Sequence, residues 1–570
     1  MLFILLNWLY IFITTFLTGF GILYLVEKKF GYRVKHIHSY LVAGLVFATT
    51  YAQWVSCFYR VNREANGIFL LISLVIFALC RKTILERLMS AWKETSPVKK
   101  VGIGLLILVT AYFTSRGSYL VDTNLYHAQS IRWIEEYGVV KGLANLQSRA
   151  AYNSSMFCLS ALYSMKYIFG QSMHAMQGFM ALILGVFCMD LGALWKRKKV
   201  ALSDFARIGA IYYLTLLHKE LMSPSSDFAV MIILFYIVIS WLDLLEEKNA
   251  STVPYSLLCV AGAYTVTLKL TAGLILILLI KPIIMLCRQK KGKEIITYLS
   301  MGILVIAPYL IRNVLICGWL LYPFSSLDLF HVDWKVPKVK VDADSFQIKS
   351  WGKGIHEFEL YGSTPDKWIP GWFATVLSAT ERLLLLGDAV ALVLFGVALV
   401  YKIYQQLVQK KSPDWDVVLV QGTIVASFLF WLLSAPLTRY GYTYILLLIL
   451  LVLGGIYIAM WGKMPWKKPV VLTVAIALFF CWKGAVLTKA IWGARSTPAY
   501  IKQTDYDSNE GEERVKEHEI NGITFYYRVS GYHPLPGGDI SFTMRGDSIK
   551  DGFKFADYNE PNIFGEYLDQ

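Results

Sequence analysis

The sequence predicts an all-α polytopic membrane protein of about 14 transmembrane helices, with a small extracytoplasmic tail that contains short strands. The first observation is composition: 56% of the 570 residues are hydrophobic, 17% are charged, and the mean hydropathy is +0.49. The second is that long apolar segments recur from end to end, which soluble domains do not show. The third is that basic residues collect in short connections between those segments.

Apolar segments of roughly 20 residues are typical of helices that cross a bilayer. The first one has no basic region before it and no small-residue cleavage site after it, so we interpret it as a retained span and not as a signal peptide. We place the spans at residues 2–26, 39–58, 67–80, 101–114, 175–194, 203–217, 227–245, 254–268, 270–287, 294–317, 381–404, 416–436, 441–461 and 469–490.

Basic residues follow alternate spans and therefore predict the topology. Examples are Lys28 and Lys29, the KRKK segment at 196–199, RQKKGK at 288–293 and KMPWKK at 463–468. Because basic connections stay in the cytoplasm, the N-terminus is expected outside. The outer side then receives 115–174, 318–380 and 491–570. The net charge of +15 is explained by these connections, and no nucleic-acid partner is expected.

The segment 154–170, SSMFCLSALYSMKYIFG, is apolar enough to be a further span. A span here would move KRKK to the outside and invert every later basic connection. We therefore interpret it as a juxtamembrane helix at the outer interface, while a crossing stays the open alternative.

The outer pieces are expected to fold without disulfides or zinc. All eight cysteines lie in or beside apolar segments, and none lies in about 320–380 or in 491–570. No Cys/His spacing typical of zinc sites is present. The tail, with segments such as INGITFYYRVSG, alternates short β-prone runs with glycines and predicts short strands.

A polar stretch, YLVDTNLYHAQSIRWIEEYG, follows the span at 101–114 and predicts a helix over 123–137 that ends at Gly138. Asp122 precedes this helix, and the most frequent role of such an aspartate is to cap it. Glu135 and Glu136 lie near Arg132 and are expected to form solvated pairs. His127, taken alone, is more often structural than catalytic.

Several further charges lie at the outer ends of predicted spans: Lys219, Asp227, Lys269, Arg312 and Arg439. Charges at membrane depth are costly and face a cavity or a partner unless they snorkel to the interface. One carboxylate, Asp122, and several cations at one face suit a reaction on an anionic lipid headgroup. The carboxylate can act as base, and the cations can bind a phosphate.

The chain resembles the GT-C superfamily of membrane glycosyltransferases, which use polyprenyl-phosphate-linked sugars. The resemblance rests on DTNLYHAQSIRWIEEYGVVKGLANL followed by NSS, and on PYLIRNVLICGWLLYP, SAPLTRYGY and MRGDSIKDGFKF. It is closest to a poorly characterised bacterial branch. In this superfamily an acidic residue on the first outer loop precedes two juxtamembrane helices, and Asp122 occupies that position.

The resemblance divides the chain into additional N-terminal spans at 1–100, a GT-C-like core at 101–490 and an extracytoplasmic tail at 491–570. The chain departs from most of the superfamily because it has three additional spans before the acidic loop. A second acidic residue often assists, in some members as a metal ligand, and Asp227 is the candidate here. No cofactor is expected with certainty, and a Mg²⁺ or Mn²⁺ ion is left open.

The resemblance implies transfer of a sugar from a polyprenyl-phosphate donor to a glycan or lipid acceptor at the outer face of a bacterial inner membrane. The expected catalytic base is Asp122. Lys269, Arg312 and Arg439 are expected to bind the donor phosphate, and His127, Lys219 and Asp227 are candidates for substrate binding. The alternatives are a polymerase or ligase of lipid-linked glycans, and a flippase or other transporter.

Overall fold

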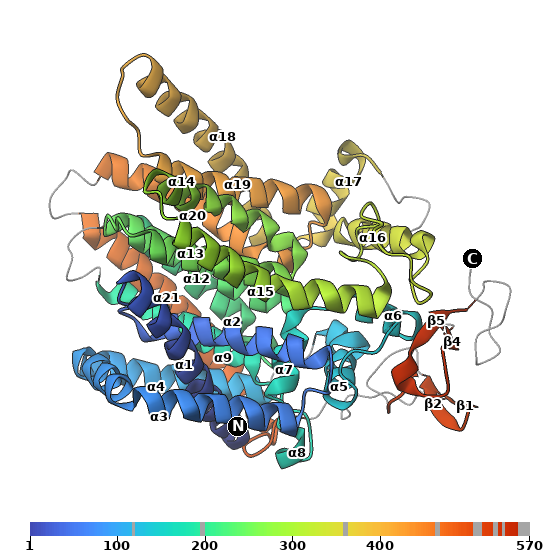
Figure 1. The fold of residues 1–570 in the computed structure, drawn as a ribbon. Helices are drawn as coiled ribbons and strands as arrows, with labels where there is room; N and C mark the ends of the chain where they lie inside the picture. The colour runs from blue at the N-terminus through green and yellow to red at the C-terminus, as the bar shows by residue number, and fades with distance from the viewer. Residues whose placement is uncertain are drawn as a thin grey trace.

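The protein is a bundle of long helices with short helices and a small group of strands at one end (Figure 1). The computed structural model describes residues 1–116, 120–193, 200–356, 363–461, 468–504, 516–527, 534–538 and 542–556. The KRKK segment at 196–199 and most of KMPWKK at 463–468 lie outside the described residues.

A helix coincides with every predicted span, although several boundaries differ. The longest is α3, which continues to Glu94 and so runs past the predicted end at residue 80. The long helices are α1 (Leu2–Phe30), α2 (Ile37–Ser56), α3 (Arg63–Glu94), α4 (Pro97–Arg116), α9 (Met176–Cys188), α11 (Leu202–Leu217), α12 (Ser226–Glu246), α13 (Thr252–Leu268), η5 (Leu270–Leu279) with α14 (Ile280–Arg288), α15 (Gly292–Cys317), α18 (Ala379–Leu407), α19 (Trp415–Ser434), α20 (Tyr442–Trp461) and α21 (Lys468–Gly493).

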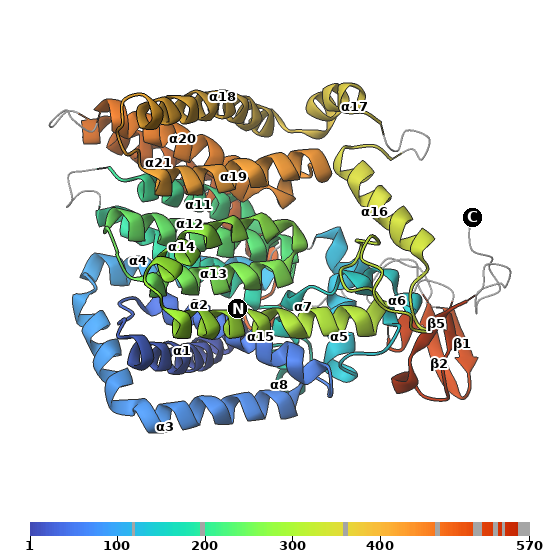
Figure 2. The same ribbon diagram turned by 45° about the horizontal axis from the view of Figure 1, so that its top comes forward.

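Nine helices within the described residues are long and apolar enough to cross a membrane. Two more, Met176–Leu191 and Thr252–Leu268, are apolar but shorter. The chain is therefore a multi-pass membrane protein that is nearly all α-helical. The central helix is α12, whose most apolar window is 78% buried, whereas α3 and α18 are only 17% buried and form opposite edges of the bundle (Figure 2).

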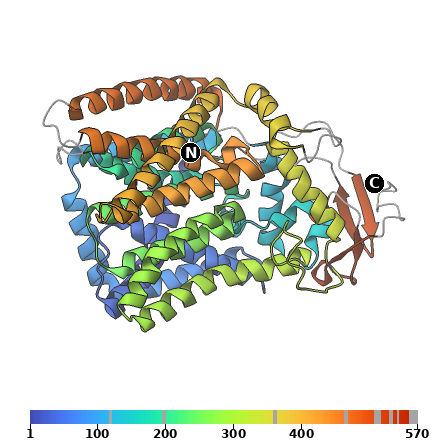
Figure 3. The ribbon, with the colours of Figure 1, turned by 90° about the horizontal axis from the view of Figure 1, so that it is seen from above.

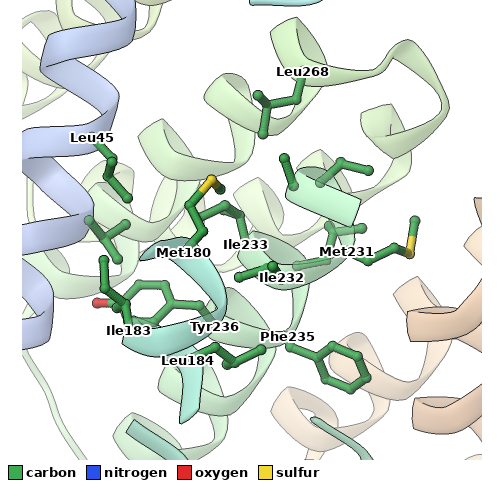
Figure 4. Close-up of a cluster of buried hydrophobic side chains, with 14 of the residues drawn as sticks. Leu45, Met180, Ile183, Leu184, Met231, Ile232, Ile233, Phe235, Tyr236 and Leu268 are labelled. Carbon is green, nitrogen blue, oxygen red and sulfur yellow. The ribbon is translucent and has the colours of Figure 1, made fainter. Parts of the chain in front are cut away.

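The core forms around α12 because its sequence is apolar on every side, which is typical of a helix surrounded by protein. All residues from Asp227 to Ile239 are buried. Side chains from α2, α9 and α13 pack against it, among them Leu45, Met180 and Leu268 (Figure 4).

The end of the bundle that carries the short helices and the strands is called the capped end here (Figures 1 and 3). The predicted helix over 123–137 is present as a π-helical turn followed by an α-helix. The short helices are η1 (Thr123–His127), α5 (Ala128–Glu136), α6 (Leu143–Leu146), η2 (Ser148–Tyr152), α7 (Ser155–Leu162), α8 (Lys166–Phe169), α16 (Lys338–Gly352), α17 (Pro365–Gly371) and η7 (Trp372–Val376), and η3 (Met189–Ala193) follows α9 toward the other end.

The segment 154–170 forms two short helices, α7 and α8, of eight and four residues. Neither is long enough to cross a membrane. The expected interfacial position is wrong for α7, because every residue of α7 is buried. This helix packs against α2, α5 and α12 and belongs to the core.

Short strands form in the tail, as the glycine-punctuated sequence predicts. Asn521 and Gly522, both with positive φ, turn the chain between β1 (Lys516–Ile520) and β2 (Ile523–Tyr527), which pair antiparallel. The other strands are β3 (Gly537–Gly538), parallel to β2, and the antiparallel pair β4 (Phe542–Met544) and β5 (Phe553–Phe555).

A second hydrophobic core joins the tail to other segments of the capped end. Phe525 and Phe553 of the strands pack with Trp133 of α5, Leu146 of α6 and Trp319, which follows α15. The strands therefore hold α5 in place from outside the bundle.

Basic connections lie at the end opposite the cap, as the charge pattern predicts (Figure 1). Lys35, between α1 and α2, is 3.7 Å from Glu247 at the end of α12. Lys29 donates a hydrogen bond to Thr297 near the start of α15 at 2.9 Å.

Candidate functional site

Four charged side chains from separate segments meet at the capped end, and we call them the charged cluster: Asp122, Asp227, Lys269 and Arg439. Asp122 directly precedes η1, and Asp227 lies in the first turn of α12. Lys269 separates α13 from η5, and Arg439 lies in η8 (Thr438–Tyr440) between α19 and α20. The fold thus brings together residues that lie far apart in the sequence.

The charges of the cluster alternate along a chain of ion pairs. Arg439 Nη2 donates to Asp122 Oδ2 at 2.5 Å, and Arg439 Nε lies 3.3 Å from Asp227 Oδ2. Lys269 Nζ donates to the other oxygen of Asp227. Two cations and two carboxylates therefore compensate one another, and each cation is held by an ionised partner that a stronger anion can displace.

Local structure explains the positions of Asp227 and Lys269. The Ser225 hydroxyl accepts a hydrogen bond from the Asp227 backbone N–H at 3.2 Å and caps α12, so the Asp227 carboxylate lies at the positive end of that helix. Lys269 has an extended backbone, with φ −157° and ψ 127°, which ends α13 and turns its side chain out of the helix.

The interpretation of Asp122 as a helix cap is wrong. Its backbone is already helical, with φ −59° and ψ −22°, and its side chain makes no capping hydrogen bond. The carboxylate contacts Arg439 instead. The following turn, η1, is π-helical, a wide turn that is frequent at functional sites.

Tyrosine rings surround the cluster. Lys269 Nζ lies 3.3 Å from the centroid of the Tyr440 ring, and Arg439 Nη2 is 3.3 Å from the Tyr440 hydroxyl. Burial raises the pKa of Tyr126 well above its ordinary value, and the negative charges of Asp122 and Asp227 raise it further. The Tyr126 hydroxyl is therefore a neutral hydrogen-bonding group.

His127 lies beside Tyr126, with ring centroids 4.4 Å apart, and its side chain is 1% exposed. Burial lowers the pKa of His127 to about 4, although Asp122 and Asp227 oppose the shift. The imidazole is thus neutral near pH 7. Its Nδ1 has no hydrogen-bond partner among the described residues, so it is available to a ligand.

Arg439 stays charged at the centre of the cluster. Burial lowers the pKa of its guanidinium, but Asp227, Tyr440 and Asp122 raise it by more, and the net shift is upward. Glu220, in η4 (His218–Glu220), is an acidic neighbour that is not among the predicted site residues. Burial raises the pKa of Glu220, while the positive charge of Arg439 lowers it.

The remaining predicted residues lie apart from these ion pairs. Lys219, adjacent to Glu220, has an exposed side chain. Arg312 is 2% exposed, and its Nε donates to Asn153 Oδ1 at 3.0 Å while its Nη1 donates to Ser56 Oγ. Three cations were expected to bind one phosphate. Lys269 and Arg439 lie together in the charged cluster, whereas Arg312 is bound to Asn153 and Ser56.

The expectation that Glu135 is a solvated surface charge is wrong. Its side chain is 2% exposed and accepts a hydrogen bond from Ser172. Burial raises the pKa of the Glu135 carboxyl. Glu136 forms the expected pair with Arg132, at 3.1 Å, and a second pair with Lys166 at 2.8 Å.

The carboxylates of the cluster are paired with cations. Asp122 and Asp227 both accept hydrogen bonds from cations. Within the part of the chain that the structure describes, no group of three or more His, Cys, Asp or Glu side chains is placed to hold a metal ion. A role for Mg²⁺ or Mn²⁺, which the resemblance leaves open, stays a prediction.

The comparison with protein families matches residues 1–446 to the family described as "Domain of unknown function (DUF8201)". The match includes Asp122, Asp227, Lys269 and Arg439, together with the first 100 residues. No curated protein and no solved structure matches the chain. The chain belongs to the DUF8201 family.

Proposed function

We propose that the chain transfers a sugar from a polyprenyl-phosphate-linked donor to a glycan or lipid acceptor, with inversion at the anomeric carbon. The observation that carries the proposal is the charged cluster, in which Lys269 and Arg439 lie beside the carboxylates of Asp122 and Asp227 at one end of a membrane bundle. The resemblance to GT-C glycosyltransferases also supports it.

In the proposed reaction the acceptor hydroxyl attacks the anomeric carbon in line with the phosphate. The new carbon–oxygen bond forms while the bond from the anomeric carbon to the phosphate oxygen breaks. The hydroxyl proton passes to Asp122, which acts as base. The polyprenyl phosphate leaves as an anion held by Lys269 and Arg439, so no general acid is required.

The ion pairs suggest how substrate binding activates Asp122. In the free protein, the carboxylate is occupied by Arg439. A donor phosphate that takes over the guanidinium releases Asp122 to the acceptor hydroxyl. The base is then free only when the donor is bound.

We further propose that the chain crosses a bacterial inner membrane about 14 times, with the capped end outside. The basic connections at the opposite end support this orientation. The coincidence of helices with all predicted spans supports the number of crossings. On this topology, donor and acceptor meet at the outer membrane surface.

The test compares Asp122→Asn with the native protein in membranes, using a panel of polyprenyl-phosphate monosaccharides. The measured quantity is release of free polyprenyl phosphate in the presence of membrane glycans and lipids. Loss of a general base is expected to lower the rate by at least about 100-fold. Asp366→Asn, an exposed position in the outer loop, is the matched control and should keep full activity.

A second measurement separates the role of Asp122 from simple damage to the site. Asp122→Asn removes the carboxylate that competes for Arg439, so undecaprenyl phosphate should bind more tightly although transfer is lost. Full transfer activity in Asp122→Asn at normal expression would rule out Asp122 as the base. Movement of the lipid without cleavage would favour a flippase, and a preference for oligosaccharide-loaded lipid would favour a polymerase or ligase.

A further inference from the structure

A cavity of about 870 Å³ opens between α2, α12, α13 and α15, away from the charged cluster. Its polar end includes Asp243, near the end of α12, whereas Asp227 of the cluster begins the same helix. The two residues are 16 positions apart (243 − 227), which corresponds to about 24 Å along a helix. The polar end of the cavity therefore lies at the end opposite the cap, and we call the cavity the lateral groove.

One face of α2 forms the wall of the lateral groove. Ser39, Ala43, Phe47, Thr50 and Trp54 recur every three or four residues, line the cavity and are all partly exposed. From Ser39 to Trp54 this face is about 22 Å long. The groove thus runs through much of the bilayer's hydrocarbon depth.

The opposite wall is also apolar. It consists mainly of aliphatic side chains from α13 and α15, such as Leu257, Leu258, Met301, Leu304 and Val305. An apolar groove of this length that lies within the hydrocarbon region suits a hydrocarbon chain, because the chain fills the cavity and gains van der Waals contacts with its walls.

The polar end of the groove has buried donors with unused hydrogen-bonding capacity. Arg207 is 4% exposed and donates from Nη2 to Asp243 at 2.6 Å, but its Nε has no partner among the described residues. Both ring nitrogens of His38 also lack a hydrogen bond there. A buried donor without a partner is costly, so these groups indicate a ligand with an acceptor such as a phosphate.

The charges at this end disfavour a ligand that is only anionic. The described residues that line it include four carboxylates and two cations, and Lys99 pairs with one of these carboxylates, that of Asp190, at 2.6 Å. With Lys99 counted, carboxylates still outnumber cations by four to three, so a phosphate alone would meet a net negative surface. A ligand that also carries an amine matches both signs. The carboxylates are those of Asp190, Asp243, Glu246 and Glu247, and the cations are Lys35 and Arg207.

We infer that the lateral groove binds one glycerophospholipid with a zwitterionic amine headgroup. An acyl chain lies along α2, the phosphate faces Arg207 and His38, and the amine faces the carboxylates. The site is independent of the proposed transfer reaction, because its polar end lies at the other end of α12 from Asp227.

The experiment uses the full chain, purified in mild detergent and examined by native mass spectrometry. We expect one tightly bound phosphatidylethanolamine, preferred about tenfold over phosphatidylglycerol after delipidation and titration. Ala43→Trp fills the groove and should abolish this binding. Ala78→Trp, the same substitution at an exposed position of α3, is the matched control and should retain it.

The headgroup preference is tested separately with Asp243→Asn and with the exposed Glu247→Gln, which does not disturb the Arg207 pair. Each should lower the preference for the amine headgroup, Asp243→Asn by roughly tenfold. Equal lipid binding by Ala43→Trp and Ala78→Trp would overturn the proposal. So would a preference of the native chain for phosphatidylglycerol, or the absence of any retained lipid.

Discussion

Two guanidinium groups at the capped end of the molecule, those of Arg439 and Arg312, have opposite surroundings. The Arg439 side chain is 26% exposed and faces the carboxylates of Asp122 and Asp227. Arg312 is 2% exposed, and it donates hydrogen bonds to the neutral side chains of Asn153 and Ser56. Both residues carry the same charge and were expected to bind the same phosphate, but their surroundings allow different chemistry.

The partners of Arg312 belong to the frame of the site. Asn153 has a positive φ of 42° and also donates to Asn313 at 2.7 Å. Its neighbour Ser154 donates to the backbone carbonyl of Leu268 at 2.8 Å, directly before Lys269. Arg312 therefore holds the loop that positions Lys269, whereas Arg439 is placed to contact a substrate.

The largest expected effect comes from Arg439→Met, which leaves Asp122 without its cation and Asp227 with Lys269 alone. We expect a loss of about 3 kcal/mol in the free energy of unfolding, measured by denaturation in detergent. Undecaprenyl phosphate binding should fall about 100-fold. The double variant Arg439→Met/Asp122→Asn should recover part of the stability, because the unpaired charge is gone. An additive result in this double variant would contradict the pairing.

The pH dependence of the free energy of unfolding is a second way to compare the surroundings of Arg439 and Arg312. Ionisable side chains lie near Arg439, whereas the partners of Arg312 are neutral. The pKa of His127 is about 4 in the folded protein and about 6.5 when unfolded, so the unfolded state binds more protons between these values. Stability is therefore lost as the pH falls from about 6.5 toward 4, by roughly 2 kcal/mol at pH 5.

His127→Gln should flatten this part of the profile of thermal midpoint against pH. Glu135 is a second group to consider, because burial raises its pKa and gives the opposite slope at acid pH. Glu135→Gln serves as the control for that contribution. An unchanged acid slope in His127→Gln would show that another group titrates.

The smallest effect is expected for Arg312→Met, which removes a buried charge and leaves two neutral acceptors unpaired. The cost should be about 1 kcal/mol, and Arg312→Lys should not restore the bond geometry at Asn153. Binding of undecaprenyl phosphate should change much less than in Arg439→Met. Equal losses of undecaprenyl phosphate binding in the two variants would show that Arg312 also belongs to the phosphate site.

Most helices could be predicted from the sequence because the length of an apolar segment is a local property. The charged cluster could be predicted only in part. Asp227, Lys269 and Arg439 are visible as charges at the ends of spans, but their ion pairs depend on the packing of α12, α13 and η8. Nothing in the sequence indicates that Glu220 lies near the charged cluster, apart from its position beside Lys219. Tyr440 follows Arg439 directly and could have been noticed.

Two errors have one physical cause, which is burial by segments that are distant in the sequence. Glu135 and α7 look like surface features because each follows a predicted exit from the membrane. In the structure, other segments cover both features. Ser172 donates a hydrogen bond to the Glu135 carboxylate, and every residue of α7 is buried. The periodicity of a sequence shows which face of a helix is apolar. It does not show whether residues from distant parts of the chain cover the other faces of that helix.

The second hydrophobic core of the capped end also sets the order in which the protein can mature. Trp133 of α5, the helix that follows Asp122 and His127, lies 6.4 Å from Phe553, ring centroid to ring centroid. Phe553 lies 420 positions after Trp133 in the sequence (553 − 133). The strands can therefore hold α5 only after all of the long helices that lie between these two residues have been synthesised.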